Sequence, residues 1–213
     1  MKITDFKIQK NNEEKMNVYV DGEYKFSMSV DSFLSEGLYK GLEITEEQIE
    51  EIKVRDGSKL AYIQIVSTLN YGMKTEKEMI DKLKEKGYKE DAIQKAIMKA
   101  KDYNLINDDY YIELYIKTKA IPAKWGEQKI ISNLYKKGIN INDIKLKITE
   151  MYDEEDKYDN AYSLAIKKLK TIKEADINKK KQKLNQFLLG KGYSYEIVSK
   201  VIKNILNDEE SDY

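Results

Sequence analysis

Three glycines, Gly87, Gly138 and Gly192, stand 51 and 54 residues apart, and the sequence around each of them repeats one apolar pattern. Apolar residues lie eight and four positions before each glycine and one, six and ten positions after it. Spacings of four place side chains on one face of a helix, so we predict two consecutive amphipathic helices around each glycine. The repeated positions are Met79, Leu83, Tyr88, Ile93 and Ile97, then Ile130, Leu134, Ile139, Ile144 and Ile148, and finally Leu184, Leu188, Tyr193, Val198 and Ile202.

The three glycines themselves are predicted to be structural residues that end the first helix of each pair. Helices commonly end in a left-handed residue, a conformation that glycine adopts without strain. The apolar residue after each glycine fits the hydrophobic contact that often accompanies such an ending. Lysine-rich helices can also resemble one another by chance, but five shared offsets in three copies favour a true repeat.

A further apolar-periodic stretch precedes each helix pair, so each repeat is predicted to be a three-helix module of about fifty residues. We therefore predict a mainly α fold in which three tandem three-helix modules form an elongated, curved array. A small antiparallel β-sheet with short helices is expected ahead of the array. The predicted divisions are an N-terminal domain (1–57), three modules (58–107, 108–152 and 160–206), an acidic linker (153–159) and an acidic tail (207–213).

The N-terminal region carries strand patterns. Two runs rich in apolar residues flank Asp21-Gly22, a pair typical of a tight hairpin turn. We expect three antiparallel strands near 2–9, 15–20 and 24–29, followed by a short helix over 30–39. Thr45 and Gln48 form a predicted capping box for a second helix that ends near Val54, before a break at 55–57.

The formal net charge is zero, but the charge is unevenly distributed. Residues 1–57 hold 8 basic and 13 acidic side chains, whereas residues 160–206 hold 11 basic and 3 acidic ones. A basic helical array indicates a polyanionic partner, although a solvated lysine face is the alternative. The candidate binding residues are Lys124, Lys129, Lys167, Lys168, Lys170, Lys179, Lys180, Lys181 and Lys183.

Several classes of function are disfavoured by composition. The chain has no cysteine and no histidine, so it lacks the thiol nucleophile, the commonest general base and the usual zinc ligands. We therefore expect no catalytic residue, no metal and no cofactor. The segment Gly190-Lys191-Gly192 lacks the spacing of a phosphate-binding loop and ends a helix instead of opening one. With no membrane span or signal pattern predicted, we expect a cytoplasmic monomer.

Five segments now point to a known family. The hairpin leading into GEYKFSMSVDSFLSEGLYKGLEIT, then TEKEMIDKLKEKGY, LINDDYYIELYI, WGEQKIISNLYKKGI and KLNQFLLGKGYSYEIVSKVI, together resemble the RecX family of regulatory proteins over about residues 2–206. The resemblance implies a non-enzymatic modulator of DNA repair that binds in the groove of the RecA–single-stranded DNA filament. It also implies inhibition of filament extension, strand exchange and the RecA ATPase.

One departure from the family concerns the basic residues. Arginine, frequent in the family's repeats, is almost wholly replaced by lysine, which lacks the planar fork that binds phosphate at two points. Two other hypotheses remain: a free-standing, sequence-independent DNA-binding array whose lysines contact phosphates, and a helical adaptor unrelated to DNA. Inhibition of RecA at concentrations too low to coat DNA would favour filament binding over these alternatives.

Overall fold

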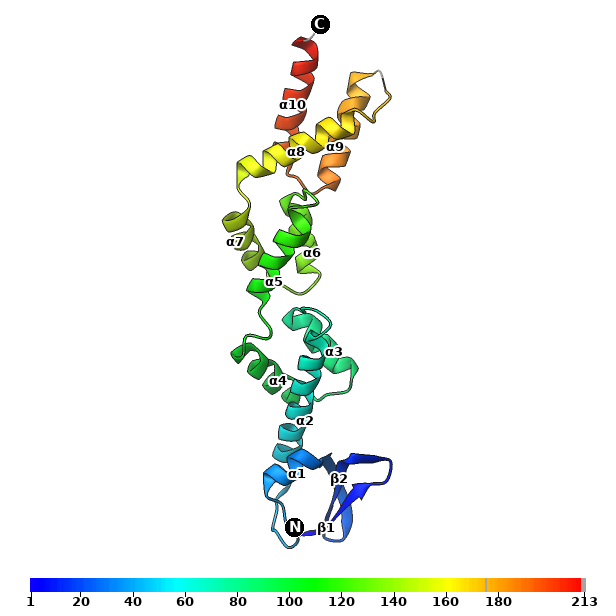
Figure 1. The fold of residues 1–213 in the computed structure, drawn as a ribbon, viewed down its shortest axis with the longest axis vertical. Coiled ribbons are helices and arrows are strands. Elements are labelled where there is room, and N and C mark those ends of the chain that lie inside the picture. The colour runs from blue at the N-terminus through cyan, green and yellow to red at the C-terminus, as the bar shows by residue number, and fades with distance from the viewer. Residues whose placement is uncertain (175, 212–213) are drawn as a thin grey trace. The chain divides into compact units, whose positions relative to one another are not determined.

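The computed structural model describes residues 1–174 and 176–211, with side chains as far as residue 206. The chain divides into two compact units, Met1–Ile106 and Asn107–Tyr213, each of which is described by itself. The first unit contains a small sheet and one three-helix module, and the second contains two further modules (Figure 1). The predicted mainly α fold, with three modules behind an antiparallel sheet, is confirmed.

The sheet consists of β1 (Ile3–Gln9), β2 (Asn12–Val20) and β3 (Glu23–Ser29), antiparallel and in chain order. Positive φ angles at Asp21 and Gly22 form the predicted turn between β2 and β3. Three strands cannot bury enough apolar surface alone, and one face packs against the helices that follow. The buried residues of this core are Ile3, Val18, Val20, Phe26, Met28, Ile44, Ile49 and Ile52.

Helix α1 (Val30–Glu36) is short, but α2 (Glu46–Leu69) is a continuous helix of 24 residues. The capping box at its start is confirmed, whereas the predicted break at 55–57 is wrong. Asp56 is buried there and accepts hydrogen bonds from the backbone N–H and hydroxyl of Ser29, at 3.1 and 2.6 Å. These bonds tie the end of β3 to the middle of α2. The N-terminal domain and the first module therefore share one helix.

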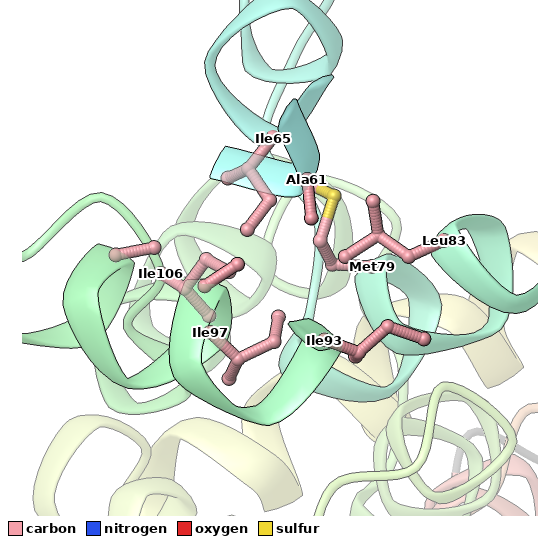
Figure 2. Close-up of a cluster of buried hydrophobic side chains, with 9 residues drawn as sticks. Ala61, Ile65, Met79, Leu83, Ile93, Ile97 and Ile106 are labelled. Carbon is pink, nitrogen blue, oxygen red and sulfur yellow. The ribbon is translucent and has the colours of Figure 1, made fainter. Parts of the chain in front are cut away.

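Module 1 comprises the second half of α2 with α3 (Glu76–Glu85) and α4 (Glu90–Asp102). Figure 2 shows side chains from all three helices converging on one core. The labelled members are Ala61, Ile65, Met79, Leu83, Ile93, Ile97 and Ile106. Thr75 forms a capping box with Glu78 at the start of α3.

Module 2 comprises α5 (Asp108–Tyr115), which continues as a π-helical turn (η1, Ile116–Ala120), α6 (Glu127–Tyr135) and α7 (Ile141–Met151). Module 3 comprises α8 (Glu154–Leu169), α9 (Ile177–Gly190) and α10 (Tyr195–Ser211). Each module has its own apolar core. All repeated apolar positions are buried except Tyr88, which is half-buried against the core of module 1.

The repeat glycines adopt the left-handed backbone that the sequence pattern predicts, with φ of 82° at Gly87, 85° at Gly138 and 92° at Gly192. In every module the residue after the glycine donates its N–H to the carbonyl of the leucine four positions before the glycine. The donors are Tyr88, Ile139 and Tyr193, the acceptors are Leu83, Leu134 and Leu188, and the distances are 3.2, 3.3 and 3.2 Å. This is the Schellman pattern, which satisfies carbonyls at a helix end.

The predicted acidic linker at 153–159 is not a linker, because α8 begins at Glu154. The Asp153 carboxylate caps this helix by accepting from the N–H of Asp156 at 2.7 Å. Acidic side chains favour a helix N-terminus, where the backbone dipole is positive, so the run of carboxylates stabilises α8. The predicted tail at 207–213 overlaps the end of α10, and residues 212–213 lie outside the described residues. Within the described part of the chain, no helix has the length and apolar character needed to cross a membrane.

Candidate polyanion-binding interface

Modules 2 and 3 meet through a contact between two backbones. Gly126, the N-cap residue of α6, donates its N–H to the carbonyl of Lys191 at 2.9 Å, and Gln128 donates to the carbonyl of Gly192 at 3.0 Å. A Cβ placed on Gly126 would overlap the carbonyl carbon of Gly192, so no side chain is tolerated at this position. We call this contact between the N-terminus of α6 and residues 191–193, together with the side-chain contacts between modules 2 and 3 around it, the joint.

Aromatic side chains reinforce the joint. The Tyr193 hydroxyl donates to the backbone carbonyl of Lys124 at 2.9 Å, and Asn160 donates its amide to the Tyr152 hydroxyl at the same distance. Both tyrosines are buried. Burial raises the pKa of the Tyr193 phenol, and the neighbouring Tyr152 raises it further. Burial likewise raises the pKa of the Tyr152 phenol, so both hydroxyls stay protonated as neutral hydrogen-bonding groups over the physiological range.

An ion pair with a buried lysine also crosses the joint. The amine of Lys157 in α8 lies 2.6 Å from the carboxylate of Glu154 and 3.4 Å from that of Glu127 in α6. Burial alone would lower the pKa of Lys157, but the two carboxylates raise it above its usual value. Lys157 is thus held charged between two modules and is not available to a partner.

Lysines and aromatic rings alternate around the joint. The Lys129 amine lies 5.1 Å from the centre of the Trp125 ring. Lys168 and Lys191 approach the Phe187 ring at 5.6 and 5.8 Å. Lysine over an aromatic face is a favourable cation–π arrangement, which orders the lysine stem while its charge stays accessible. Both rings are half-buried.

The backbone segments that carry Lys129 and Lys191 adjoin each other at the joint. The backbone of Lys129 in module 2 lies against Gly192 in module 3, so a Cβ on Gly192 would be 2.5 Å from it. Lys191 directly precedes Gly192, and therefore side chains from both modules emerge from neighbouring points on the backbone. Basic side chains interleaved with aromatic rings are a common way to bind single-stranded nucleic acid.

A second group of lysines flanks the connection between α8 and α9. Lys167 and Lys170 lie at the end of α8, and Lys179 and Lys181 lie in the first turns of α9. All four are exposed, and none of them forms an ion pair with another described residue. Lys179 also acts electrostatically on the Glu174 carboxyl, whereas the charges of the other three are open to a partner.

The remaining predicted lysines are less available. Lys183 pairs with Glu174 at 2.5 Å, and this contact lowers the pKa of the Glu174 carboxyl. Lys124 donates its amine to the hydroxyl of Ser163 at 2.5 Å, so both its side chain and its carbonyl belong to the joint. Lys180 is half-buried. The structure thus divides the predicted set into exposed and internally bonded residues.

Sequence reasoning misses several residues of this interface. The only sequence pattern that contains Lys191 is the segment Gly190-Lys191-Gly192, which matches a phosphate-binding loop poorly. No sequence pattern singles out Phe187. Gly126 carries no distinctive signal, because glycine is itself a common N-cap residue. Gly192, whose close approach leaves no room for a side chain on Gly126, is remote in sequence.

The comparisons with known proteins agree along the chain. Residues 1–45 match the regulatory protein RecX N-terminal domain, residues 61–99 the first three-helix domain of RecX, and residues 154–202 the third. The chain is 39% identical to "Regulatory protein RecX" of Clostridium perfringens over 98% of both chains. It is 35% identical to the Clostridium botulinum protein of the same name, over 99% of both chains.

Solved structures give the same result. A crystal structure of regulatory protein RecX superposes with a TM-score of 0.70 at 31% identity, over 95% of this chain and 98% of that one. RecX from Lactobacillus salivarius gives a TM-score of 0.65 at 32% identity, over 70% of this chain and 97% of that one. From the three matched domains, the near-complete coverage and the shared fold, the chain belongs to the RecX family of regulatory proteins.

Proposed function

We propose that this protein binds RecA filaments on single-stranded DNA and inhibits their ATPase activity, strand exchange and extension. The proposal rests on membership of the RecX family, which contains regulatory proteins, together with the RecA target that the sequence resemblance implies. It acts without a catalytic residue or cofactor of its own. We further propose that it works as a monomer in the cytoplasm.

The observation that supports this function best is the lysine-rich surface of module 3 and the joint. Such a surface suits a partner that presents many phosphates or carboxylates, as a nucleoprotein filament does. Each helix of about 14 residues is about 21 Å long, so a succession of modules could contact more than one filament subunit. Several weak contacts on linked modules would then combine into tight binding.

The second candidate function is direct, sequence-independent binding of DNA, with RecA affected only through competition for the strand. The lysine–aromatic groups at Trp125 and Phe187 favour it, because such groups bind bare single strands in other proteins. The two functions therefore predict that inhibition of RecA responds differently to added free DNA.

A titration of the RecA single-stranded-DNA-dependent ATPase separates the two functions. The protein is added at concentrations far below those needed to coat the DNA, and bare oligothymidylate is then added in excess. Filament binding predicts inhibition at these low concentrations that the oligothymidylate does not relieve. Direct DNA binding predicts inhibition only near coating concentrations, with full relief by the competitor. No inhibition at any concentration would reject the proposed function.

A further inference from the structure

Gly192 differs from the repeat glycine of module 1. Gly87 and Gly192 have the same left-handed backbone, but a Cβ on Gly87 would meet nothing within 4 Å. A Cβ on Gly192 would collide with the backbone and Cβ of Lys129, both at 2.5 Å. The helix ending explains both glycines, but it does not explain why Gly192 is enclosed by another module.

Gly126 is enclosed in the same way although its backbone needs no glycine. Its φ is −75°, which any L-residue adopts, and it makes no side-chain cap for α6. Glycine is a common N-cap residue, but here the close approach of residues 191–193 also leaves room for no other residue. The joint brings the backbones of modules 2 and 3 together so closely that it allows no side chain on either of them.

The joint is also bonded on several sides. Two backbone hydrogen bonds, the Tyr193–Lys124 bond and the Glu127–Lys157 ion pair all cross it. Backbone bonds between segments fix both distance and orientation, because neither partner has rotamer freedom to lose. A connection of this kind restrains two modules far more than a single covalent linker does.

We infer that Gly126 and Gly192 are positioning residues, which hold modules 2 and 3 as one rigid body so that Lys129, Lys168 and Lys191 engage the same single-stranded DNA backbone. This inference rests on the second candidate function, direct binding of DNA, and adds to it the joint that presents lysines from both modules together. Rigid presentation favours binding because less conformational freedom is lost when the strand is bound.

The test uses Gly126→Ala in the full chain. Alanine suits the backbone angle but not the space, so the variant must open the joint while leaving the core of each module unchanged. Gly190→Ala is the matched control, because it lies in α9 only two residues from Gly192 and its added Cβ would meet nothing within 4 Å. A general effect of placing alanine near the joint would appear in both variants.

The first measurement is of the joint itself. The chain contains no cysteine, so Lys136→Cys in module 2 and Ser199→Cys in module 3, both at exposed positions, allow clean spin labelling. We expect one narrow distance distribution in the parent and in Gly190→Ala, and a shifted or broadened one in Gly126→Ala. A broad distribution in the parent would overturn the rigid body.

The second measurement is binding of labelled oligothymidylate over a range of salt, read by anisotropy and by the fluorescence of Trp125, the only tryptophan. We expect Gly126→Ala to bind at least about tenfold more weakly at low salt, because the linked lysines no longer act together. Its log–log salt slope should be smaller by about 0.7 for every phosphate that the variant no longer neutralises. A merely destabilised module would bind more weakly in proportion to its unfolded fraction and keep the slope of the parent.

Tyr193→Phe provides a second variant in case Gly126→Ala does not fold, because it removes one hydrogen bond across the joint without a clash. It should give a smaller change in the same direction. Unchanged affinity and slope in a variant whose spin-label distances have changed would overturn the positioning role. If the parent binds oligothymidylate with the expected variant effects but never inhibits RecA, the proposed function fails and this inference stands.

Discussion

At the scale of single residues, the repeat glycines differ in their surroundings. Valine at a left-handed position is strained by about 1–2 kcal/mol, which is the destabilisation expected for Gly87→Val and Gly138→Val. Gly192→Val should be destabilised by more, because the joint adds a steric clash to the strain. Urea denaturation of the three variants measures this order. Equal destabilisation at all three positions would contradict this prediction, because it would mean that the clash at the joint adds nothing to the free-energy loss of Gly192→Val.

Tyr193 predicts a dependence of stability on alkaline pH. Its pKa is raised by burial in the folded chain, whereas an exposed tyrosine ionises near pH 10. The unfolded chain therefore loses this proton first, and the free energy of unfolding falls as pH rises above about 10. Tyr193→Phe should show a shallower decline than the parent between about pH 9 and 11. Lysine titration affects both proteins alike, so parallel curves would contradict the prediction.

At the scale of elements, α2 shows where sequence reasoning succeeds and where it fails. The capping box at Thr45 depends on residues three apart and is predictable. The Arg55-Asp56-Gly57 segment suggests a break because aspartate and glycine are poor helix formers. The helix continues because Asp56 bonds to Ser29, 27 residues away, and because Gly57 leaves room for Ala92, whose Cβ would lie 3.1 Å from a Cβ at this position. These tertiary contacts have no local signal.

The same distinction holds for the candidate interface. The apolar periodicity and the glycine endings are local patterns, and they predict the modules correctly. Lysine-rich segments can also be read from the sequence, but their internal partners cannot. Lys183 pairs with Glu174 across nine residues and Lys124 with Ser163 across 39, so only the fold separates bonded lysines from open ones.

Asp56 gives a prediction about the element that joins the sheet to module 1. Asp56→Ala leaves the N–H of Ser29 without its partner in a partly buried site, which should cost about 1–3 kcal/mol. The destabilisation should fall on the unit formed by Met1–Ile106. Glu51→Ala is the control, because Glu51 lies in the same helix and forms an exposed ion pair of little energetic value. The measurement is denaturation of the isolated unit Met1–Ile106 carrying either substitution. An Asp56→Ala unit as stable as the parent unit would contradict the prediction.

At the scale of the whole molecule, the two units should fold independently. Among the described residues, no buried cluster draws members from both units, because the cores of the sheet and module 1 lie before residue 107 and the other two lie after it. Fragments 1–106 and 107–213 should therefore each show helical circular dichroism and a cooperative thermal transition. If one fragment stayed unfolded alone but gained helix when the other was added, the two units would not be independent folding units.

The uneven charge of the molecule gives the sharpest test of function. The exposed lysines Lys167, Lys170, Lys179 and Lys181 make no ion pair within the described residues, so their replacement by glutamine should spare the fold. Inhibition of the RecA ATPase should weaken most at low salt, and the log–log salt slope should fall by about 0.7 for every single-strand phosphate left unneutralised. Glutamine at Lys82, Lys84 and Lys86 of α3 and its C-terminal turn is the control, where inhibition should persist. Salt screens charge least at low ionic strength, so the loss of these lysines should matter most at about 50 mM salt. If the four-lysine variant inhibited RecA as well as the parent there, binding would have to depend on apolar or acidic surfaces.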